Sequence, residues 1–349
     1  MNRRAFFAAT LAAPALRKAA RGAEQQKLRC ATDGTFKILM ISDLHYRPAP
    51  DVYGIALTEK LIDIEKPDLV IVAGDCMSGA DCQTEQEVRA TIGHIASAME
   101  KKRVFWAITF GNHDQEHFPK TGLDKDTVLG IYSSYPHNLN GGYVRGIHGA
   151  GNKHLLVWNA AGTKPVYCLW LIDSNMYFTE GKNHPYDWIH ADQIQWYYRT
   201  SEELERTYGG KVPGLMFFHI PLREFNDLVN HGKIIGVRQE PEAPSPVNGG
   251  MFAAVLDRGD VRGIYCGHDH TNNYVGRWRG VELGYDGSLG HYAYPRVPPD
   301  DPSNGKVRGG RVFLISDGSP ASHKTWMRTK DGTANWESTS EAYMEYMLK

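Results

Sequence analysis

The sequence predicts an α/β sandwich, and two observations point to it. Short apolar runs with the character of buried strands alternate along the chain with longer stretches whose apolar residues recur at helical spacing. The 349 residues carry 42% hydrophobic and 23% charged side chains, a composition typical of soluble globular proteins. A chain of this length can bury a full core in one large domain, so we expect a single domain.

The first part of the chain repeats a pattern of strand followed by helix. Thr84 is placed as the N-cap of one helix, and Glu87 completes a capping box with it. Pro136 closes the helix that begins at Asp124. The elements expected here are the strands Phe36–Ser42, Asp68–Ala73 and Val104–Thr109 and the helices Tyr53–Glu65, Thr84–Lys102 and Asp124–Tyr135.

The remainder of the chain holds more strands than helices. Gly209 and Gly210 stop the helix that begins at Ala191. The stretch Gly232–Val247, rich in Pro and Gly, is expected to be a long loop that lines a site rather than a linker between domains. The expected elements are the strands Leu155–Trp158, Tyr167–Ile172, Leu215–Phe218, Val261–Cys266, Tyr274–Arg279, Val281–Tyr285 and Arg311–Ser316 and the helices Ala191–Tyr208 and Asn248–Asp257.

The pattern of residues 1–23 predicts an export signal. Arg3 and Arg4 precede the apolar run Ala5–Leu16, and small residues follow up to Ala23. The arginine pair resembles the bacterial twin-arginine signal, whose pathway carries folded proteins. The apolar run is too short to span a membrane, and no other stretch is long enough. We therefore expect a periplasmic or secreted protein with residues 24–349 as its mature domain and no stable membrane insertion.

The numbers of charged residues and of cysteines limit which partners and which disulfides we expect. The 39 Lys and Arg against 40 Asp and Glu give a net charge of -1, which lacks the basic excess of nucleic-acid binders, so we expect no nucleic-acid partner. Five cysteines in an exported chain permit disulfides but leave at least one thiol unpaired. Cys168 and Cys266 lie in apolar strand-like runs and are expected to be core residues.

Five of the expected strands end in polar clusters. Ligands of open α/β sheets collect at the carboxyl ends of strands, so these clusters should converge on one crevice. Together they offer carboxylate, amide and imidazole groups without thiolate, which suits two borderline or hard metal ions rather than a cysteine-based structural zinc. The clusters are Asp43-Leu44-His45, Gly74-Asp75, Gly111-Asn112-His113-Asp114, His219 and Gly267-His268-Asp269-His270.

Each cluster taken alone also has an ordinary structural explanation. A strand-terminal Asp such as Asp43 often caps a turn, and a single histidine such as His219 is unremarkable. The clusters that begin at Gly111 and Gly267 are more specific, because glycine lets the backbone bend tightly and the polar residues after it then face one point. The ordered set of five, each after an apolar strand, is what predicts a site.

This order of clusters resembles that of the calcineurin-like metallophosphoesterases, from about Phe36 to the last strands. The resemblance implies a four-layer α/β/β/α sandwich with mixed sheets around a dinuclear metal centre. Five stretches are similar to the purple acid phosphatase-like branch, which includes the Dcr-type phosphatases of plants and fungi. They are Phe36–Tyr46, Gly111–Glu116, Pro213–Phe225, Val247–Gly250 and Gly259–Asn273.

The resemblance also implies a role for each residue of the clusters. The first ion would be held by Asp43, His45 and His270 and the second by Asn112, His219 and His268, with Asp75 bridging the two. His113 would lie beside the substrate as an acid or electrostatic catalyst, with Asp114 as its orienting partner.

One position departs from the purple acid phosphatases. Those enzymes carry a tyrosine that binds ferric iron three positions after the bridging aspartate, and this chain has Ser78 there. His45 takes over as a nitrogen ligand, as in the non-purple members of the superfamily. The expected cofactor is therefore a pair of divalent or trivalent ions, Fe, Mn, Zn or a mixture, without a ferric tyrosinate.

The implied function is the hydrolysis of a small phosphate monoester by attack of a metal-bridging hydroxide. A phosphodiesterase or nucleotide pyrophosphatase on the same core stays open, because specificity lies in the loops. A metal- or ligand-binding protein without turnover also stays open, although neither His113 nor Asp114 is needed merely to hold metal. Several residues in loops or beside motifs are candidates for substrate contact and equally for surface or packing roles: Tyr46, His117, Asn175, Tyr177, Arg223, His291 and Tyr292.

Overall fold

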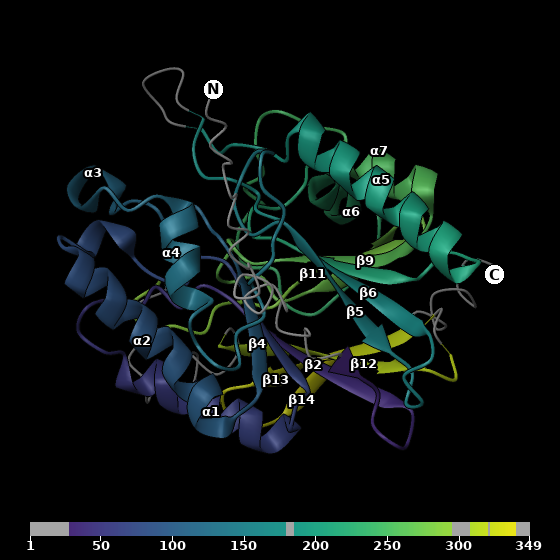
Figure 1. Ribbon diagram of the computed structural model, residues 1–349, viewed down its shortest axis with the longest axis horizontal. Helices are drawn as coiled ribbons and strands as arrows, with labels where there is room; N and C mark the ends of the chain where they lie inside the picture. Colours follow the sequence, from purple (N-terminus) through teal and green to yellow (C-terminus); the bar gives the residue numbers. More distant parts are fainter. Residues whose placement is uncertain (1–27, 179–184, 295–307, 320–321, 340–349) are drawn as a thin grey trace, which may run out of the picture.

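Two β-sheets lie face to face between two layers of helices (Figure 1). The computed structural model describes residues 28–178, 185–294, 308–319 and 322–339. The predicted export signal, residues 1–23, lies outside the described residues. Within the described part of the chain, no helix combines the length and the apolar character that crossing a membrane requires.

The six-stranded sheet has the order β14-β13-β12-β2-β3-β4. Strands β2, β3 and β4 run parallel, and β12 joins β2 antiparallel, so the sheet is mixed. The parallel part follows from the alternation of strands with helices early in the chain. The strands are β2 (Thr35–Ile41), β3 (Leu69–Ala73), β4 (Phe105–Thr109), β12 (Gly309–Ser316), β13 (His323–Thr329) and β14 (Ala334–Thr339).

The eight-stranded sheet has the order β1-β5-β6-β7-β9-β11-β10-β8. Strands β6, β7, β9 and β11 form its parallel centre, and β5 and β10 flank that centre antiparallel. The strands are β1 (Leu28–Arg29), β5 (Lys153–Trp158), β6 (Pro165–Leu171), β7 (Gly214–Phe217), β8 (Ile234–Ile235), β9 (Val261–Cys266), β10 (Val275–Trp278) and β11 (Val281–Tyr285).

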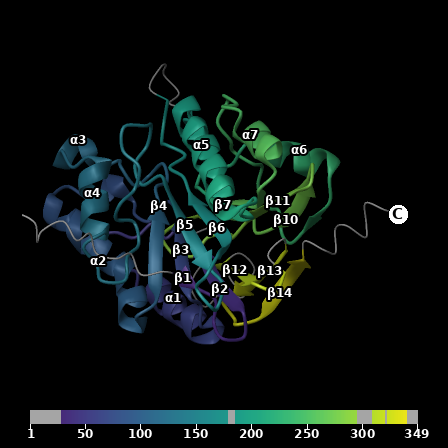
Figure 2. The ribbon, with the colours of Figure 1, turned by 45° about the vertical axis from the view of Figure 1, so that its right-hand side comes forward.

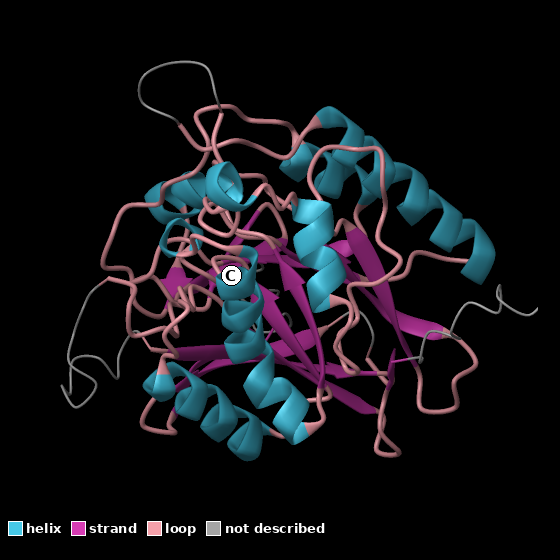
Figure 3. Cartoon of the chain, turned by 60° about the vertical axis from the view of Figure 1, so that its left-hand side comes forward, coloured by secondary structure: helices cyan, strands magenta, loops and turns pink. Residues whose placement is uncertain are grey.

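Helices cover the outer face of each sheet, as Figures 2 and 3 show. Helices α1 (Val52–Glu65), α2 (Glu85–Lys102) and α4 (Lys125–Tyr132) share an apolar cluster with the six-stranded sheet. Helices α5 (Ala191–Tyr208), α6 (Glu224–His231) and α7 (Met251–Arg258) share one with the eight-stranded sheet. Two short helical turns, η1 (Gly79–Asp81) and α3 (Phe118–Thr121), lie in loops.

Strand β2 shows how the sequence builds these layers. Phe36, Ile38 and Met40 belong to the apolar cluster that fills the space between the two sheets, whereas Leu39 and Ile41 belong to the cluster under the helices. Successive side chains of a strand point to opposite faces, so the apolar run of four residues that ends β2 is buried on both. The predicted four-layer α/β/β/α arrangement with mixed sheets is thus confirmed.

Several local predictions are also confirmed. Helix α2 begins with the predicted capping box, in which Thr84 Oγ1 accepts from the backbone N–H of Glu87 at 3.2 Å and Glu87 Oε2 accepts from that of Thr84 at 3.0 Å. All five cysteines are buried free thiols, so Cys168 and Cys266 are core residues as expected.

Other boundaries differ from the predictions. Helix α4 ends at Tyr132 rather than Tyr135, where the Ser134 hydroxyl donates to the carbonyl of Ile131 and favours a turn. Helix α7 starts at Met251 rather than Asn248, because Gly250 has a left-handed backbone. Helix α6 and strands β1, β13 and β14 were not predicted, and the short strand β8 interrupts the expected loop 232–247.

Candidate metal centre

The polar clusters predicted from the sequence meet at one edge of the sandwich. They follow the parallel strands β2, β3 and β4 of one sheet and β7 and β9 of the other. Two groups of buried side chains have candidate ligand atoms that all lie within 4.8 Å of one another, and Asp75 belongs to both. The groups are Asp43, His45, Asp75 and His270, and Asp75, His219 and His268.

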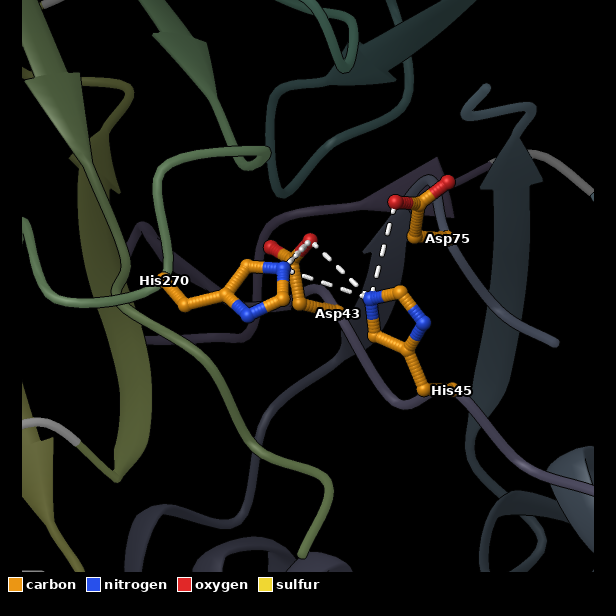
Figure 4. Close-up of side chains that lie close together, drawn as sticks. All are labelled: Asp43, His45, Asp75 and His270. Carbon is orange, nitrogen blue, oxygen red and sulfur yellow. Dashed lines mark hydrogen bonds and ion pairs between the residues drawn. The ribbon is translucent and has the colours of Figure 1, made fainter. Parts of the chain in front are cut away.

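Figure 4 shows the side chains of the first group pointing toward one another from the turns that follow β2, β3 and β9. His45 Nε2 lies 3.3 Å from His270 Nε2 and 3.6 Å from Asp75 Oδ2. His270 Nε2 lies 3.2 Å from Asp43 Oδ1. Two nitrogens each about 2.1 Å from one tetrahedral ion stand roughly 3.4 Å apart. The spacing of the two imidazoles therefore fits a shared metal ion.

The second group has the same spacing. His219 Nε2 lies 3.1 Å from Asp75 Oδ2 and 3.3 Å from His268 Nδ1. Asn112 Oδ1 is buried, and no hydrogen-bond partner for it occurs among the described residues, while its Nδ2 donates to the Tyr177 hydroxyl at 3.0 Å. A buried carbonyl oxygen without a donor suits a cation ligand.

Hydrogen bonds outside the ligand groups orient two of the imidazoles. His219 Nδ1 donates to the carbonyl of Ala73 at 2.9 Å, and His270 Nδ1 donates to the carbonyl of Tyr294 at 2.9 Å. A carbonyl can only accept, so Nδ1 of each ring carries a proton, and Nε2, which faces the other ligand atoms, is the nitrogen available to a metal ion.

The backbone is strained where the ligands emerge from the strands. Asp43, His45, Asp75 and His268 all have positive φ, between 46° and 81°. Non-glycine residues in this conformation cost about 1 kcal/mol or more each and persist where the surroundings impose them, which is common at functional sites. The conformation of these turns thus lowers the stability of the fold somewhat, and it brings the ligands to one point.

Glycines make these turns possible by their lack of a side chain. A Cβ on Gly111 would stand 2.2 Å from Asp75 Oδ1, and one on Gly267 would stand 2.5 Å from the Ser42 hydroxyl. Both contacts are shorter than any real Cβ contact, so no larger residue fits without moving Asp75 or the residues beside Asp43. The glycines predicted to bend the chain are therefore required for close packing as well.

Burial sets the charge state of several ligands. It is the main reason that the pKa of His45 and of His268 falls to about 3, which keeps both imidazoles neutral, as metal ligands must be. Burial alone would raise the pKa of Asp43, but the charges of His270 and His219 outweigh it and lower the pKa to about 2. Asp43 is thus a carboxylate at neutral pH.

His113 lies in the same place but takes another partner than predicted. Its Nδ1 is 2.9 Å from Glu116 Oε1, and the Tyr177 hydroxyl donates to that same oxygen at 3.2 Å. Burial by itself would lower the pKa of His113, but the hydrogen bond to Glu116 and the charge of Asp75 raise it to about 9. The side chain is 38% exposed, so it can meet a substrate.

Asp114, predicted as the orienting partner of His113, does something else. Its two carboxylate oxygens accept from the backbone N–H groups of Gly111 at 2.7 Å and Met77 at 2.9 Å. Neighbouring residues in a tight turn point in different directions, so the side chain of Asp114 closes the turn instead of contacting His113. The side chain of Glu116, three residues after His113, lies on the same side as the imidazole. In the structure Glu116, not Asp114, contacts the imidazole of His113, and Asp114 holds the loop.

Four of the candidate ligands, His45, Asp75, His268 and His270, line a cleft of about 320 Å³ together with His113. Its wall also includes Glu116, Ser78 and Arg47 and the tyrosines Tyr186, Tyr292 and Tyr294. Ser78 Oγ lies 3.4 Å from His45 Nδ1, so the serine at the position of the missing tyrosine ligand stands behind the histidine that takes its place.

The predicted substrate-contact candidates divide into three sets. Tyr292 lines the cleft, and Tyr177 contacts both Asn112 and Glu116. Tyr46 and His117 are fully buried away from it. The others make local contacts: Asn175 donates to Trp188, Arg223 to Pro246 and the backbone of His291 to Asp51.

Three residues that line the cleft were not predicted from the sequence: Glu116, Tyr186 and Tyr294. Glu116 stands three residues after His113, a spacing that allows contact within a helical turn, and this was the one available signal. Tyr186 reaches His268 with its ring from a loop that follows β6, and nothing in the local sequence points to that contact.

Comparison with known proteins places these observations in a family. The sequence model for the Calcineurin-like phosphoesterase family matches residues 36–272. A protein of Arabidopsis thaliana named "Probable inactive purple acid phosphatase 14" is 31% identical over 78% of this chain and 75% of its own length. "Phosphatase DCR2" of Saccharomyces cerevisiae is 29% identical over 71% of this chain and 46% of its own length.

A solved structure shows the same fold at low sequence identity. The dimetal phosphatase from Danio rerio superposes with a TM-score of 0.57 and 13% identity, over 87% of this chain and 98% of that one.

Proposed function

Because the chain belongs to the calcineurin-like phosphoesterase family, we propose that it hydrolyses small phosphate monoesters at a centre of two metal ions. The observation that carries the proposal is that His113, paired with Glu116, lines the same cleft as both ligand groups. Neither side chain is needed to hold an ion. A site that only bound metal would have no use for an exposed imidazole fixed by a carboxylate.

The donor set fits Fe, Mn or Zn in nitrogen and oxygen coordination. Asp43, His45 and His270 would hold one ion, Asn112, His219 and His268 the other, and Asp75 both. Bound there, two ions would polarise the phosphoryl oxygens and activate a water for attack on phosphorus. Thiolates take no part, because burial raises the pKa of Cys76 and Cys266 well above the ordinary value.

His113 supplies the proton for the leaving group. Glu116 holds its Nδ1, so Nε2 is the nitrogen left to face the substrate. A proton given from Nε2 to the ester oxygen turns a poor alkoxide leaving group into an alcohol, a contribution of roughly 10²- to 10⁴-fold to the rate. Tyr177 in turn holds Glu116 and ties this pair to Asn112.

One relative is named a probable inactive phosphatase and another a phosphatase. The first experiment therefore tests whether this protein hydrolyses phosphate esters. We expect the purified protein to hold two ions per chain and to hydrolyse p-nitrophenyl phosphate faster than bis-p-nitrophenyl phosphate. His113→Ala should keep both ions and lose most turnover, while His231→Ala, at the end of α6, should change neither.

The outcomes of this experiment separate the alternatives. Faster hydrolysis of the diester would favour the phosphodiesterase. Two ions without hydrolysis of either ester would favour a binding protein. Full activity in a metal-replete His113→Ala protein would exclude the proposed role of that side chain.

The proposal extends to residues 1–23, which we infer are an export signal of the twin-arginine type that precedes a single mature domain. Its support is the Arg3-Arg4 pair before a short apolar run. Replacing both arginines with lysine should leave the protein in the cytoplasm of a bacterial host with this pathway. Unchanged export of that variant, measured by cell fractionation, would contradict the inference.

A further inference from the structure

Three tyrosines line the cleft without serving the metal centre as ligands. Tyr186, Tyr292 and Tyr294 come from two separate loops and stand in the same wall as His45, His113 and the ligands after β9. Catalysis on phosphate alone does not need aromatic rings, so their presence bears on the other half of the substrate.

Two of the rings pack directly on candidate ligands. Tyr294 stacks on His270 with ring centroids 4.0 Å apart and an interplanar angle of 22°, and Tyr186 meets His268 edge-on at 4.3 Å. The Tyr294 hydroxyl donates to Glu240 Oε2 at 2.9 Å, which fixes the ring, yet half of the side chain stays exposed. Each ligand group thus has an aromatic ring at its side.

The third ring, that of Tyr292, lines the cleft without packing on a candidate ligand. Tyr292 is 37% exposed, and the Arg47 guanidinium lies over one of its faces at 4.7 Å. Arg47 is itself paired with Asp81 at 2.9 Å, so this charge is balanced within the wall. A surface of tyrosine rings whose nearby charges are paired favours a flat, uncharged group over a second anionic group.

We propose that Tyr186, Tyr292 and Tyr294 bind the aromatic ring of the substrate alcohol, so that the substrate class is the phosphate monoesters of phenols. The inference rests on the proposed function, because it takes the phosphate to sit over the two ions. Two of the three rings pack on ligand imidazoles, so a ring attached directly to the ester oxygen would lie closest to them. In the reaction, the oxygen of water bonds to phosphorus, the bond from phosphorus to the phenol oxygen breaks, and the phenol leaves with a proton.

Binding tests the ring contact apart from turnover. We expect the metal-loaded protein to bind phenylphosphonate about 3- to 10-fold more tightly than methylphosphonate, as one aromatic contact allows. Neither compound has an ester bond to hydrolyse. Tyr292→Leu should weaken this preference, and it is the primary variant because the ring contact described for Tyr292 is with Arg47 rather than with a candidate ligand. Tyr208→Leu, equally exposed at 37% at the end of α5, should keep it.

Tyr294 needs a pair of variants, because its carbonyl also holds His270. Tyr294→Phe keeps the ring and should keep the preference, whereas Tyr294→Leu should lose it with the metal content unchanged. Loss of metal in Tyr294→Leu would assign that ring to holding His270, and Tyr292→Leu would then decide. Equal binding of the two phosphonates by the wild-type protein would overturn the proposal.

Turnover separates failure of this inference from failure of the proposed function. We expect Tyr292→Leu to lower kcat/KM about 3- to 10-fold for phenyl phosphate and less than 2-fold for glycerol 3-phosphate. Adenosine 5′-monophosphate, whose ring is separated from the phosphate by ribose, should follow glycerol 3-phosphate. Equal losses on all three substrates would overturn the tyrosine subsite and leave the phosphatase. No turnover of any substrate, with the phosphonate preference intact, would overturn the phosphatase and leave the subsite.

Discussion

The imidazole of His113 is held by a carboxylate three residues further along the chain. Glu116 lies 2.9 Å from its Nδ1, and the charge of Glu116 favours the protonated ring that must give up a proton. We predict that Glu116→Gln lowers kcat roughly 10- to 100-fold and leaves KM nearly unchanged, since the amide keeps the shape of the side chain and loses its charge. Steady-state kinetics on the metal-loaded protein measure this split.

The control for Glu116 is Glu85→Gln, an exposed residue of α2 whose described partner is Arg89. It should change neither constant. Tyr177→Phe, which keeps Glu116 but removes its second hydrogen bond, should lower kcat less than Glu116→Gln does. A Glu116→Gln enzyme with wild-type kcat would show that the pair is structural only.

Asp75 is the single carboxylate shared by the two groups of ligand atoms. We predict that Asp75→Asn reduces the metal content below two ions per chain, because it removes a negative charge that both ions share. Elemental analysis after gel filtration measures the ratio. A variant that still carries two ions per chain would contradict the bridging role.

Asp269 provides a matched control, because it lies between two candidate ligands in the sequence and points elsewhere. Its carboxylate accepts from the Tyr285 hydroxyl at 2.6 Å and from the Ala243 backbone at 3.3 Å. Asp269→Asn should keep both ions and lose on the order of 1 kcal/mol of stability. If Asp269→Asn lost as much metal as Asp75→Asn does, the loss would not be specific to the bridging position.

At the level of elements, the end of β4 decides whether the site can form. Gly111 leaves no room for a Cβ beside Asp75, so a methyl group there must push that carboxylate aside. We predict that Gly111→Ala loses metal and turnover and also lowers the midpoint of thermal unfolding, because the new Cβ would stand 2.3 Å from the backbone nitrogen of Asp75. Circular dichroism and elemental analysis on the same sample measure the two effects.

Gly130 offers the opposite case on helix α4. A Cβ there meets nothing within 4 Å, and alanine is the better helix former by about 1 kcal/mol. Gly130→Ala should therefore keep both ions and raise the unfolding midpoint. If Gly111→Ala retained two ions and full turnover, the close packing of Gly111 on Asp75 would not matter for function.

The strands that carry the site were predictable, and several others were not. Strands such as β3, with every residue buried, are apolar throughout and end in ligands, so both their position and their role follow from the sequence. Strand β13 lies between β12 and β14, and it alternates buried with more exposed residues and carries Lys324 and Arg328, a weaker pattern. Contacts such as that of Tyr294 on His270 depend on loops that no local pattern fixes.

At the scale of the whole molecule, the centre depends on how the two sheets sit against each other. Asp43, Asp75 and Asn112 follow strands of one sheet, and His219 and His268 follow strands of the other. The five clusters could be predicted to converge, because each follows a strand at its carboxyl end. The spacing between them is set by the apolar layer between the sheets, which becomes visible only in three dimensions.

One buried acid also joins the two sheets. Glu282 on β11 accepts from the Tyr265 hydroxyl in its own sheet, and it lies 3.3 Å from His323 on β13 and 2.8 Å from the Ser338 hydroxyl on β14 in the other. Burial would raise the pKa of Glu282, but the hydrogen bond and charge of His323, followed by Tyr265 and Ser338, lower it from 4.5 to about 2. Its carboxylate is therefore more stable in the folded protein than in the unfolded chain.

The sign of this shift fixes a pH window. A carboxyl whose pKa is lower in the folded state stabilises the fold above its unfolded value, near 4.5, and loses that contribution as the pH falls through about 2. We predict that Glu282→Gln costs on the order of 3 kcal/mol of unfolding free energy at pH 7 and that the deficit shrinks below pH 4.5. Urea unfolding of wild type and variant at several pH values measures it, with Glu337→Gln, exposed on β14, as the control. A deficit that stays constant from pH 7 to pH 3 would mean that Glu282 joins the sheets by shape alone, without its charge.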